Sequence, residues 1–195
     1  MSKTTGIVMA GVGGQGILLA AQIIARAALA AGYDVKTNEV HGMAQRGGSV
    51  VAQIRFGEKV YSPLVPEGSA QVLGSLERIE ALRFKGYLAA GGLAVVSRQA
   101  IIPVTVSSGQ ATYPADVEER LRAEFPRLVY IDVIAVAEKL CDPRVANVIL
   151  LGAMSTALLL SDECWAESIA QCVKPAYRDI NTKAFEEGRH LAVAV

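Results

Sequence analysis

One run near the start of the chain constrains its fold more than any other feature. An apolar, β-branched segment at residues 5–10 (TGIVMA) leads directly into the glycine loop 11–16 (GVGGQG), and an Ala- and Leu-rich stretch follows at 17–31. This order predicts a strand, a tight turn and a helix, which is the opening unit of a doubly wound α/β sheet. Gly11, Gly13 and Gly16 also have the spacing of a dinucleotide-binding fingerprint.

The rest of the chain predicts a single domain over residues 1–195, with a Rossmann-like, three-layer α/β fold and a mostly parallel sheet. Further strands are expected at 33–40, 50–56, 93–97 and 128–132, with a strand or its flank at 69–76. Helices are expected at 77–87, 116–125, 133–140, 147–160 and, as two pieces or one helix kinked at Pro175, at 163–187. The turn at Gly57 predicts an inserted β-hairpin in which residues 59–62 pair back on 50–56.

Composition excludes several classes of protein. The 19 Lys and Arg balance the 19 Asp and Glu, so no basic excess favours nucleic acid as a partner. Hydrophobic residues make up 52% of the chain and the mean hydropathy is +0.34, which excludes a disordered chain and predicts an apolar face for a protein partner. No apolar run reaches the roughly 20 residues of a membrane-spanning helix, and the N-terminus lacks the pattern of a signal peptide, so we expect a cytoplasmic protein.

The metal-binding residue types are few. The three cysteines, Cys141, Cys164 and Cys172, are odd in number and form no C-x-x-C unit, and the two histidines, His41 and His190, are far apart in sequence. We therefore expect no metal, disulfide framework or iron–sulfur cluster in this chain alone.

The glycine loop has two interpretations. A ligand-binding loop would use Gly11, Gly13, Gly14, Gln15 and Gly16, together with the N–H groups of the following helix, to hold NAD, FAD or another phosphate-bearing ligand. Glu39 follows Gly16 by 23 positions, near the place of a ribose-binding acid. Alternatively, the glycines only allow close helix packing or present the loop to another protein.

A second motif follows at residues 39–50 (EVHGMAQRGGSV). Arg46, flanked by Gly47 and Gly48, offers a guanidinium and accessible backbone N–H groups to a phosphate or carboxylate, or else pairs with an acid across a subunit interface. His41 is a weak catalytic candidate, because a single loop histidine is usually only hydrogen-bonded. Met43 suits an adaptable interface contact.

Two acidic features are ambiguous. Asp132 ends an expected strand, where α/β ligands often bind, but it could equally cap the following helix. Glu118 and Glu119, with Arg120 and Arg122, favour a solvated helix face.

Taken together, GVGGQG and EVHGMAQRGGSV resemble the gamma-type subunits of 2-oxoacid:ferredoxin oxidoreductases, and more narrowly the small beta subunits of the indolepyruvate enzymes. The resemblance extends through Phe56-Gly57, residues 61–63, the helix after Glu77, and Asn147 with Leu151-Gly152, and so spans nearly the whole chain.

The resemblance implies a CoA-dependent oxidative decarboxylation of an aryl-pyruvate, with electrons passing to ferredoxin. It places thiamine diphosphate and the iron–sulfur clusters on a large alpha subunit or separate subunits. This chain would then shape the active-site entrance, support assembly and contribute to the coenzyme A channel. The competing hypotheses are a stand-alone NAD- or FAD-binding protein and an assembly subunit without a ligand.

Overall fold

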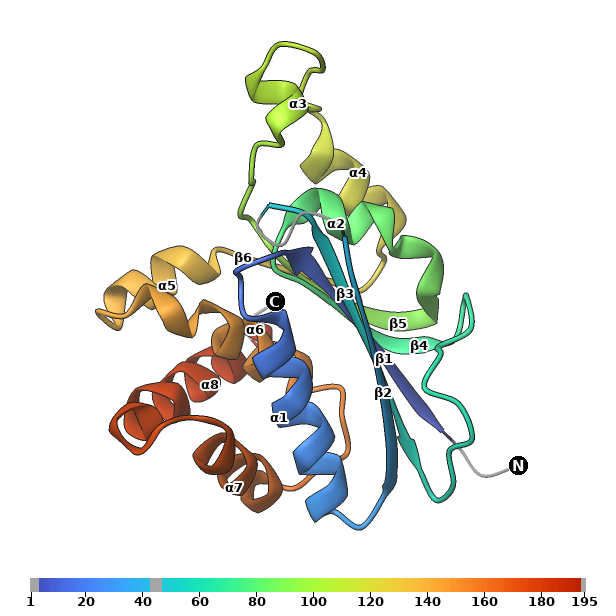
Figure 1. The fold of residues 1–195 in the computed structure, drawn as a ribbon, viewed down its shortest axis with the longest axis vertical. Helices are drawn as coiled ribbons and strands as arrows, with labels where there is room; N and C mark the ends of the chain where they lie inside the picture. The colour runs from blue at the N-terminus through green and yellow to red at the C-terminus, as the bar shows by residue number, and fades with distance from the viewer. Residues whose placement is uncertain (1–3, 43–46, 194–195) are drawn as a thin grey trace.

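The sheet contains six strands in the order β2-β3-β1-β4-β5-β6 (Figure 1). The computed structural model describes residues 4–42 and 47–193. The strands are β1 (Thr5–Val12), β2 (Asp34–His41), β3 (Ser49–Gly57), β4 (Ala70–Ser75), β5 (Leu88–Ser97) and β6 (Leu128–Ile131). β1, β4, β5 and β6 pair in parallel, whereas β3 runs antiparallel to both β1 and β2. The expected mostly parallel sheet is confirmed.

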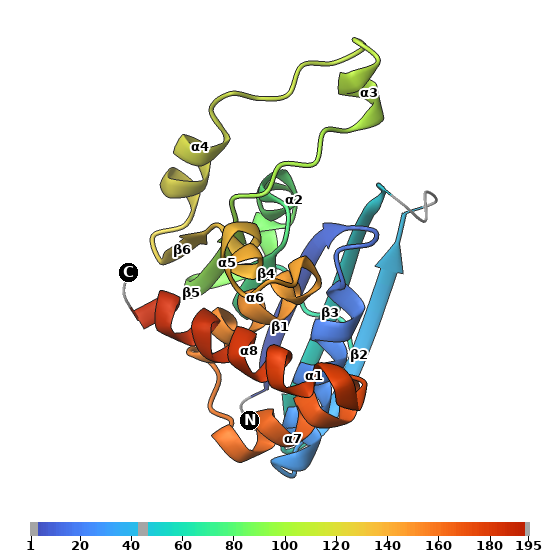
Figure 2. The same cartoon turned by 90° about the vertical axis from the view of Figure 1, so that its left-hand side faces the viewer.

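Helices cover both faces of the sheet and give the expected three layers (Figures 1 and 2). On one side lie α1 (Ile17–Ala30), α5 (Val133–Lys139), α6 (Ala146–Ser155), α7 (Asp162–Cys172) and α8 (Arg178–Val193). On the other side lie α2 (Arg78–Arg83) and α4 (Val117–Glu124). The short α3 (Val104–Ser107) stands clear of the sheet. Among the described residues, no helix has both the length and the apolar character to cross a membrane.

α6 is the central helix of the first layer. Each of its ten residues is buried, as a helix with apolar residues on all sides predicts. It crosses α8 at two glycines: a Cβ at Gly152 would lie 2.0 Å from the Phe185 carbonyl oxygen, and one at Gly188 would lie 1.9 Å from that of Ile149. The two backbones therefore meet at a distance that only glycine allows.

The predicted hairpin between residues 50–56 and 59–62 is wrong. Residues 59–62 form no strand, because β1 and β2 already occupy both edges of β3. The segment is held by side chains instead: the Asp34 carboxylate accepts a hydrogen bond from the Val60 N–H at 2.9 Å, and Arg55 donates to the carbonyl oxygens of Ser62 and Leu64.

Most other expected elements are present with shifted ends. Gly32 follows α1 with a φ of +84°, and a 3-10 turn at Pro175–Tyr177 separates α7 from α8, as expected. The helix expected at 77–87 ends at Arg83 and passes through a second 3-10 turn, Lys85–Tyr87, into β5. The helix expected at 147–160 ends at Ser155, and a third 3-10 turn, Pro143–Val145, precedes it.

Candidate functional site

The carboxyl ends of the parallel strands bring the two sequence motifs to one edge of the sheet. The Gly13 N–H donates to the Gly48 carbonyl oxygen at 2.9 Å, which joins the glycine loop to the segment before β3. Ligands of doubly wound sheets bind at this edge. Of the predicted site residues, Arg46 lies outside the described residues, as does Met43.

The glycine loop and the segment before β3 both depend on backbone conformations that favour glycine. Gly14, Gly16 and Gly47 have φ angles of +103°, +80° and +78°. Gly11 lacks a positive φ, but a Cβ there would lie 2.7 Å from the Gln15 side-chain oxygen and 2.8 Å from Ile17 Cδ1. The loop is therefore shaped partly by conformation and partly by close approach.

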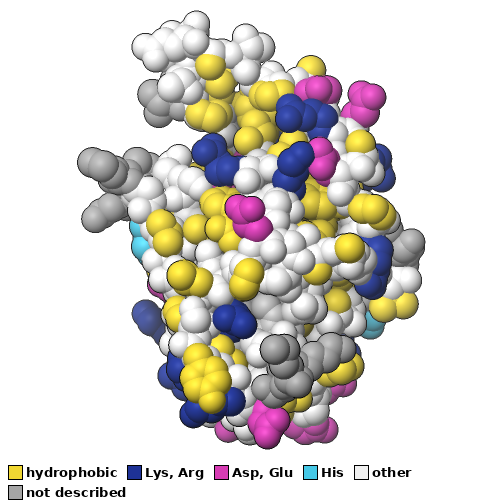
Figure 3. Space-filling view, turned by 90° about the vertical axis from the view of Figure 1, so that its right-hand side faces the viewer, with side chains coloured by type: hydrophobic (Ala, Val, Ile, Leu, Met, Phe, Trp, Pro, Cys, Tyr) yellow, Lys and Arg dark blue, Asp and Glu magenta, His cyan; other side chains and the backbone are white. Residues whose placement is uncertain are grey.

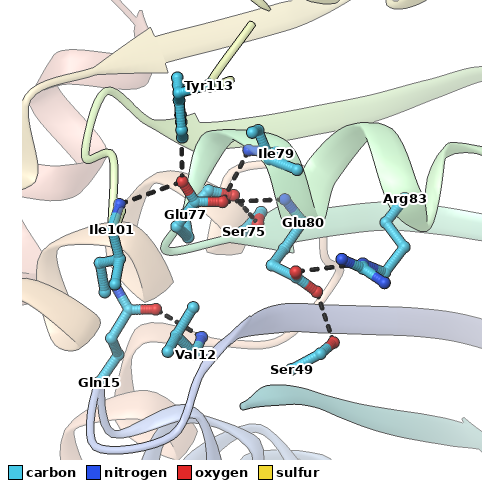
Figure 4. Close-up of polar contacts among 10 residues, drawn as sticks. All are labelled: Val12, Gln15, Ser49, Ser75, Glu77, Ile79, Glu80, Arg83, Ile101 and Tyr113. Atoms are coloured by element: carbon cyan, nitrogen blue, oxygen red, sulfur yellow. Dashed lines mark hydrogen bonds and ion pairs between the residues drawn. The ribbon is translucent and has the colours of Figure 1, made fainter. Parts of the chain in front are cut away.

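Gln15 supports the loop with its whole side-chain amide, and Figure 4 shows its contact with Val12. Its Oε1 accepts a hydrogen bond from the Val12 N–H at 2.7 Å, and its Nε2 donates to the Leu76 carbonyl oxygen and to Gln99 Oε1, both at 2.8 Å. Because both polar atoms are engaged, Gln15 acts here as a structural support, and its contact with a ligand stays a prediction.

Gly16, the last glycine of the loop, is bound by a side chain of α6. Asn147, which is 3% exposed, donates from Nδ2 to the Gly16 carbonyl oxygen at 3.0 Å. Gly16 is the N-cap of α1 and has no side chain to bond the first turn. Within the described ranges 4–42 and 47–193 no side chain caps that turn, so its N–H groups can face an anion or the backbone of a partner.

A hollow of about 380 Å³ lies beside the loop. It is lined by Val12, Gly13, Gly14, Gly16, Ile17, Leu18, His41 and Val50. His41, with 48% of its side chain exposed, thus shares a surface with the glycine loop. Its Nε2 lies 3.9 Å from a carboxylate oxygen of Glu39. The lining is mostly backbone and apolar side chains, an arrangement suited to positioning a ligand.

The position of Glu39 disfavours the dinucleotide interpretation. In the nucleotide-binding arrangement the acid lies on the strand next to β1. Here β3 lies between β2 and β1. Glu39 on β2 is therefore two strand spacings from β1, roughly 10 Å, instead of one.

Two buried glutamates near the start of α2 were not anticipated as site residues (Figure 4). Glu77, 2% exposed, caps α2 by accepting from the Ile79 and Glu80 N–H groups, and its other oxygen accepts from the Ile101 N–H and the Tyr113 hydroxyl. Glu80, 5% exposed, accepts from the Ser49 hydroxyl at the start of β3 and from Arg83. The only local signal was an acidic residue at a strand-to-helix junction.

The remaining acidic candidates have structural roles. Asp132 accepts from the Ala135 N–H at 3.0 Å and so caps α5. Glu118 pairs with Arg122 one helical turn away on the exposed face of α4. Neither belongs to the hollow beside the glycine loop.

Comparison with known proteins identifies relatives over almost the whole chain. The family model for pyruvate ferredoxin/flavodoxin oxidoreductase matches residues 6–191. The chain is 45% identical over 191 residues to the indolepyruvate oxidoreductase subunit IorB of Thermococcus kodakarensis, which covers 95% of both chains.

Solved structures share the fold. The gamma subunit of a keto/oxoacid ferredoxin oxidoreductase from Geobacter sulfurreducens matches with a TM-score of 0.72 and 23% identity, over 98% of this chain and 99% of that one. The 2-oxoglutarate:ferredoxin oxidoreductase of Magnetococcus marinus, with 2-oxoglutarate, coenzyme A and succinyl-CoA bound, matches with a TM-score of 0.75 and 21% identity, over 100% of this chain and 32% of that one.

Proposed function

The chain belongs to the pyruvate ferredoxin/flavodoxin oxidoreductase family, and from this premise we propose that its complex oxidises indolepyruvate or a related aryl-pyruvate. It is the small subunit of a 2-oxoacid:ferredoxin oxidoreductase, an enzyme that also contains larger partner subunits. The observation that carries the choice of substrate is the 45% identity to an indolepyruvate oxidoreductase subunit over 95% of both chains.

In the proposed reaction the 2-oxoacid loses its carboxylate as CO2, and its remaining acyl carbon forms a thioester with coenzyme A. Two electrons reduce two molecules of ferredoxin, and the thiol proton is released. Indolepyruvate, coenzyme A and two oxidised ferredoxins thus give indoleacetyl-CoA, CO2, two reduced ferredoxins and one proton.

We assign thiamine diphosphate and the iron–sulfur clusters to the larger alpha subunit. No group of three His, Cys, Asp or Glu among the residues that the structure describes could hold a metal ion, and Cys141, Cys164 and Cys172 are free thiols. The described donor set therefore does not fit a cluster, and we route no electron transfer through these residues.

This chain's own contribution is to position ligands and to enclose the active centre. The glycine loop and the first turn of α1, together with His41 and Val50, present backbone N–H groups, one imidazole and an apolar hollow at one edge. We propose that this edge faces the active centre of the large subunit, shapes its entrance and contributes to the coenzyme A channel. Arg46 has the side chain for that role, as a partner for the phosphates of coenzyme A or for an acidic residue across the subunit interface. The position of His41 suits hydrogen bonding to a carbonyl or phosphate.

The test is reconstitution. The large subunit is purified without oxygen, alone and together with this chain, and ferredoxin reduction is followed with coenzyme A and either indolepyruvate, pyruvate or 2-oxoglutarate. We expect the complex to prefer indolepyruvate and the large subunit alone to be far slower. Full activity of the large subunit without this chain would refute the assigned role, and a preference for pyruvate or 2-oxoglutarate would refute the substrate.

A further inference from the structure

Residues 99–115, here called the arm, differ in composition from the rest of the chain. Their sequence, QAIIPVTVSSGQATYPA, contains no Asp, Glu, Lys, Arg or His, although 19% of the whole chain is charged. Charges border the arm on both sides, at Arg98 and Asp116. A solvated surface segment of this length normally carries several charges, whereas the centres of protein interfaces are depleted of them.

The arm is nevertheless on the surface. Most of its residues are exposed, and Ile102 leaves 51% of its surface uncovered. In Figure 2 the arm, with α3 near its end, extends away from the sheet and the other helices. The space-filling view shows a projection at the top of the molecule without acidic or basic side chains (Figure 3).

The arm has an ordered shape of its own. The Pro103 carbonyl oxygen accepts from the N–H groups of Val106 and Ser107, and the Thr105 carbonyl oxygen accepts from those of Gln110 and Ala111. These bonds close the outer part of the arm into a compact turn. It therefore offers a partner a formed surface, which lowers the ordering cost of binding.

Both ends of the arm are fixed to one buried carboxylate (Figure 4). Glu77 accepts from the Ile101 N–H at 3.2 Å and from the Tyr113 hydroxyl at 3.0 Å. Arg78 also donates to the Tyr113 oxygen, at 2.9 Å. Because the two ends meet on α2, the arm leaves the domain in a defined direction.

That direction is set at the same sheet edge as the glycine loop. The arm follows the carboxyl end of β5, and its first residue, Gln99, accepts the hydrogen bond from Gln15. A partner that covers the glycine loop is thus also within reach of the arm. This observation favours the large subunit over a second copy of this chain as the occupant.

We propose that the arm docks into an uncharged groove of the larger partner subunit, with Ile102 as an apolar anchor, and so seats the glycine-loop edge against that subunit. The inference rests on the proposed function, because it takes the partner from there. It adds a specific binding element and the chemistry of the surface that receives it.

The test uses the full chain and the purified large subunit, with their affinity measured by titration without oxygen. Ile102→Asp and Ala111→Lys place charges of opposite sign on exposed arm positions. An uncharged groove should reject both, so we expect each to weaken binding at least tenfold. Each variant's thermal midpoint should remain that of the wild type, because neither side chain belongs to the core.

Leu159→Asp is the matched control. Leu159 is 95% exposed and lies near Thr5 at the opposite edge of the sheet, so its substitution should leave the affinity unchanged. Wild-type affinity in both arm variants would overturn the inference, as would a loss with only one sign of charge or an equal loss in Leu159→Asp. A wild-type chain that dimerises through the arm, and becomes monomeric in Ile102→Asp, would assign the arm to a second copy instead.

The same titration distinguishes a failure of the proposed function from a failure of the arm inference. If the wild-type chain does not bind the large subunit at all, the proposed partner is wrong, and the arm inference falls with it. If the wild type binds and supports activity while the arm variants bind equally well, only the inference is lost.

Discussion

The glycine loop and the arm leave the same edge of the sheet but are built in opposite ways. The loop is tied to its surroundings by Gln15, by Asn147 and by the Gly13–Gly48 backbone bond. The outer arm is closed by backbone bonds to itself and exposes apolar and uncharged side chains. The difference teaches that side-chain changes in the loop should cost stability, whereas changes in the outer arm should cost association.

The largest effect is expected at Gly16. Gly16→Ala would force a φ of +80° on a residue with a Cβ and place that Cβ 2.5 Å from Nδ2 of buried Asn147. The conformational and packing penalties together should lower the free energy of unfolding by about 3 kcal/mol. Thermal unfolding of the purified chain should show a midpoint lowered by roughly 6 to 12 °C.

Gly14→Ala is the control for this change. Gly14 also has a positive φ, +103°, but a Cβ there would meet nothing within 4 Å. Its cost should therefore be conformational only, about 1 to 2 kcal/mol. Equal losses in the two variants would show that the contact with Asn147 adds nothing and that the loop is less tightly held than described.

Gln15→Ala should have the next largest effect. It removes three hydrogen bonds and leaves the Val12 N–H and the Leu76 carbonyl oxygen without the Gln15 partner, for a loss of about 2 kcal/mol. Gln110→Ala is the matched change in the arm, where the glutamine is exposed, and should stay within about 0.5 kcal/mol of the wild type. Urea unfolding measures both, and a neutral Gln15→Ala would contradict the contrast between the two regions.

The sequence predicts which segments form helices and strands better than it predicts which elements pack or pair with one another. The strand, glycine loop and helix at the start of the chain are readable because spacing and periodicity are local properties. The hairpin at residues 59–62 was wrong because both edges of β3 are taken, one by β2, which precedes it in the chain, and the other by β1, which lies before α1. A local turn signal cannot report that both edges of a strand are already occupied.

The same limit applies to the site. The positions of the glycines and of His41 at one edge follow from the rule for parallel strands, and the motif that carried the resemblance identified the family. The support of Gln15 by Gln99 spans 84 residues, and that of Gly16 by Asn147 spans 131. No local pattern marks such partners, so the sequence could not predict the structural support that Gln15 gives to the loop.

Glu77→Gln tests whether the base of the arm is held independently of the loop. The amide retains one accepting oxygen but its nitrogen cannot accept, so either the α2 cap or the arm contacts are lost, at about 1.5 kcal/mol. Hydrogen exchange should become faster at Ile101 and stay unchanged in α1. Glu118→Gln, on the exposed face of α4, should change neither measurement. Unaltered exchange at Ile101 would show that Glu77 does not hold the arm.

The smallest expected effect is a pH dependence at the base of the arm. Burial raises the pKa of Tyr113 above the ordinary value of about 10, and the negative charge of Glu77 acts in the same direction, against the hydrogen bond from Arg78. The folded chain therefore holds the Tyr113 proton more tightly than the unfolded chain. This contribution to stability is complete below about pH 10 and is lost as the pH rises from there through the folded-state pKa.

Tyr113→Phe should consequently lose less stability than the wild type between pH 9 and 11 in urea unfolding. Tyr61→Phe, changed at a side chain that is 89% exposed, should follow the wild type. Identical slopes for Tyr113→Phe and the wild type would mean that the arm's base carries no linked proton, and the contrast with the loop would then rest on packing alone.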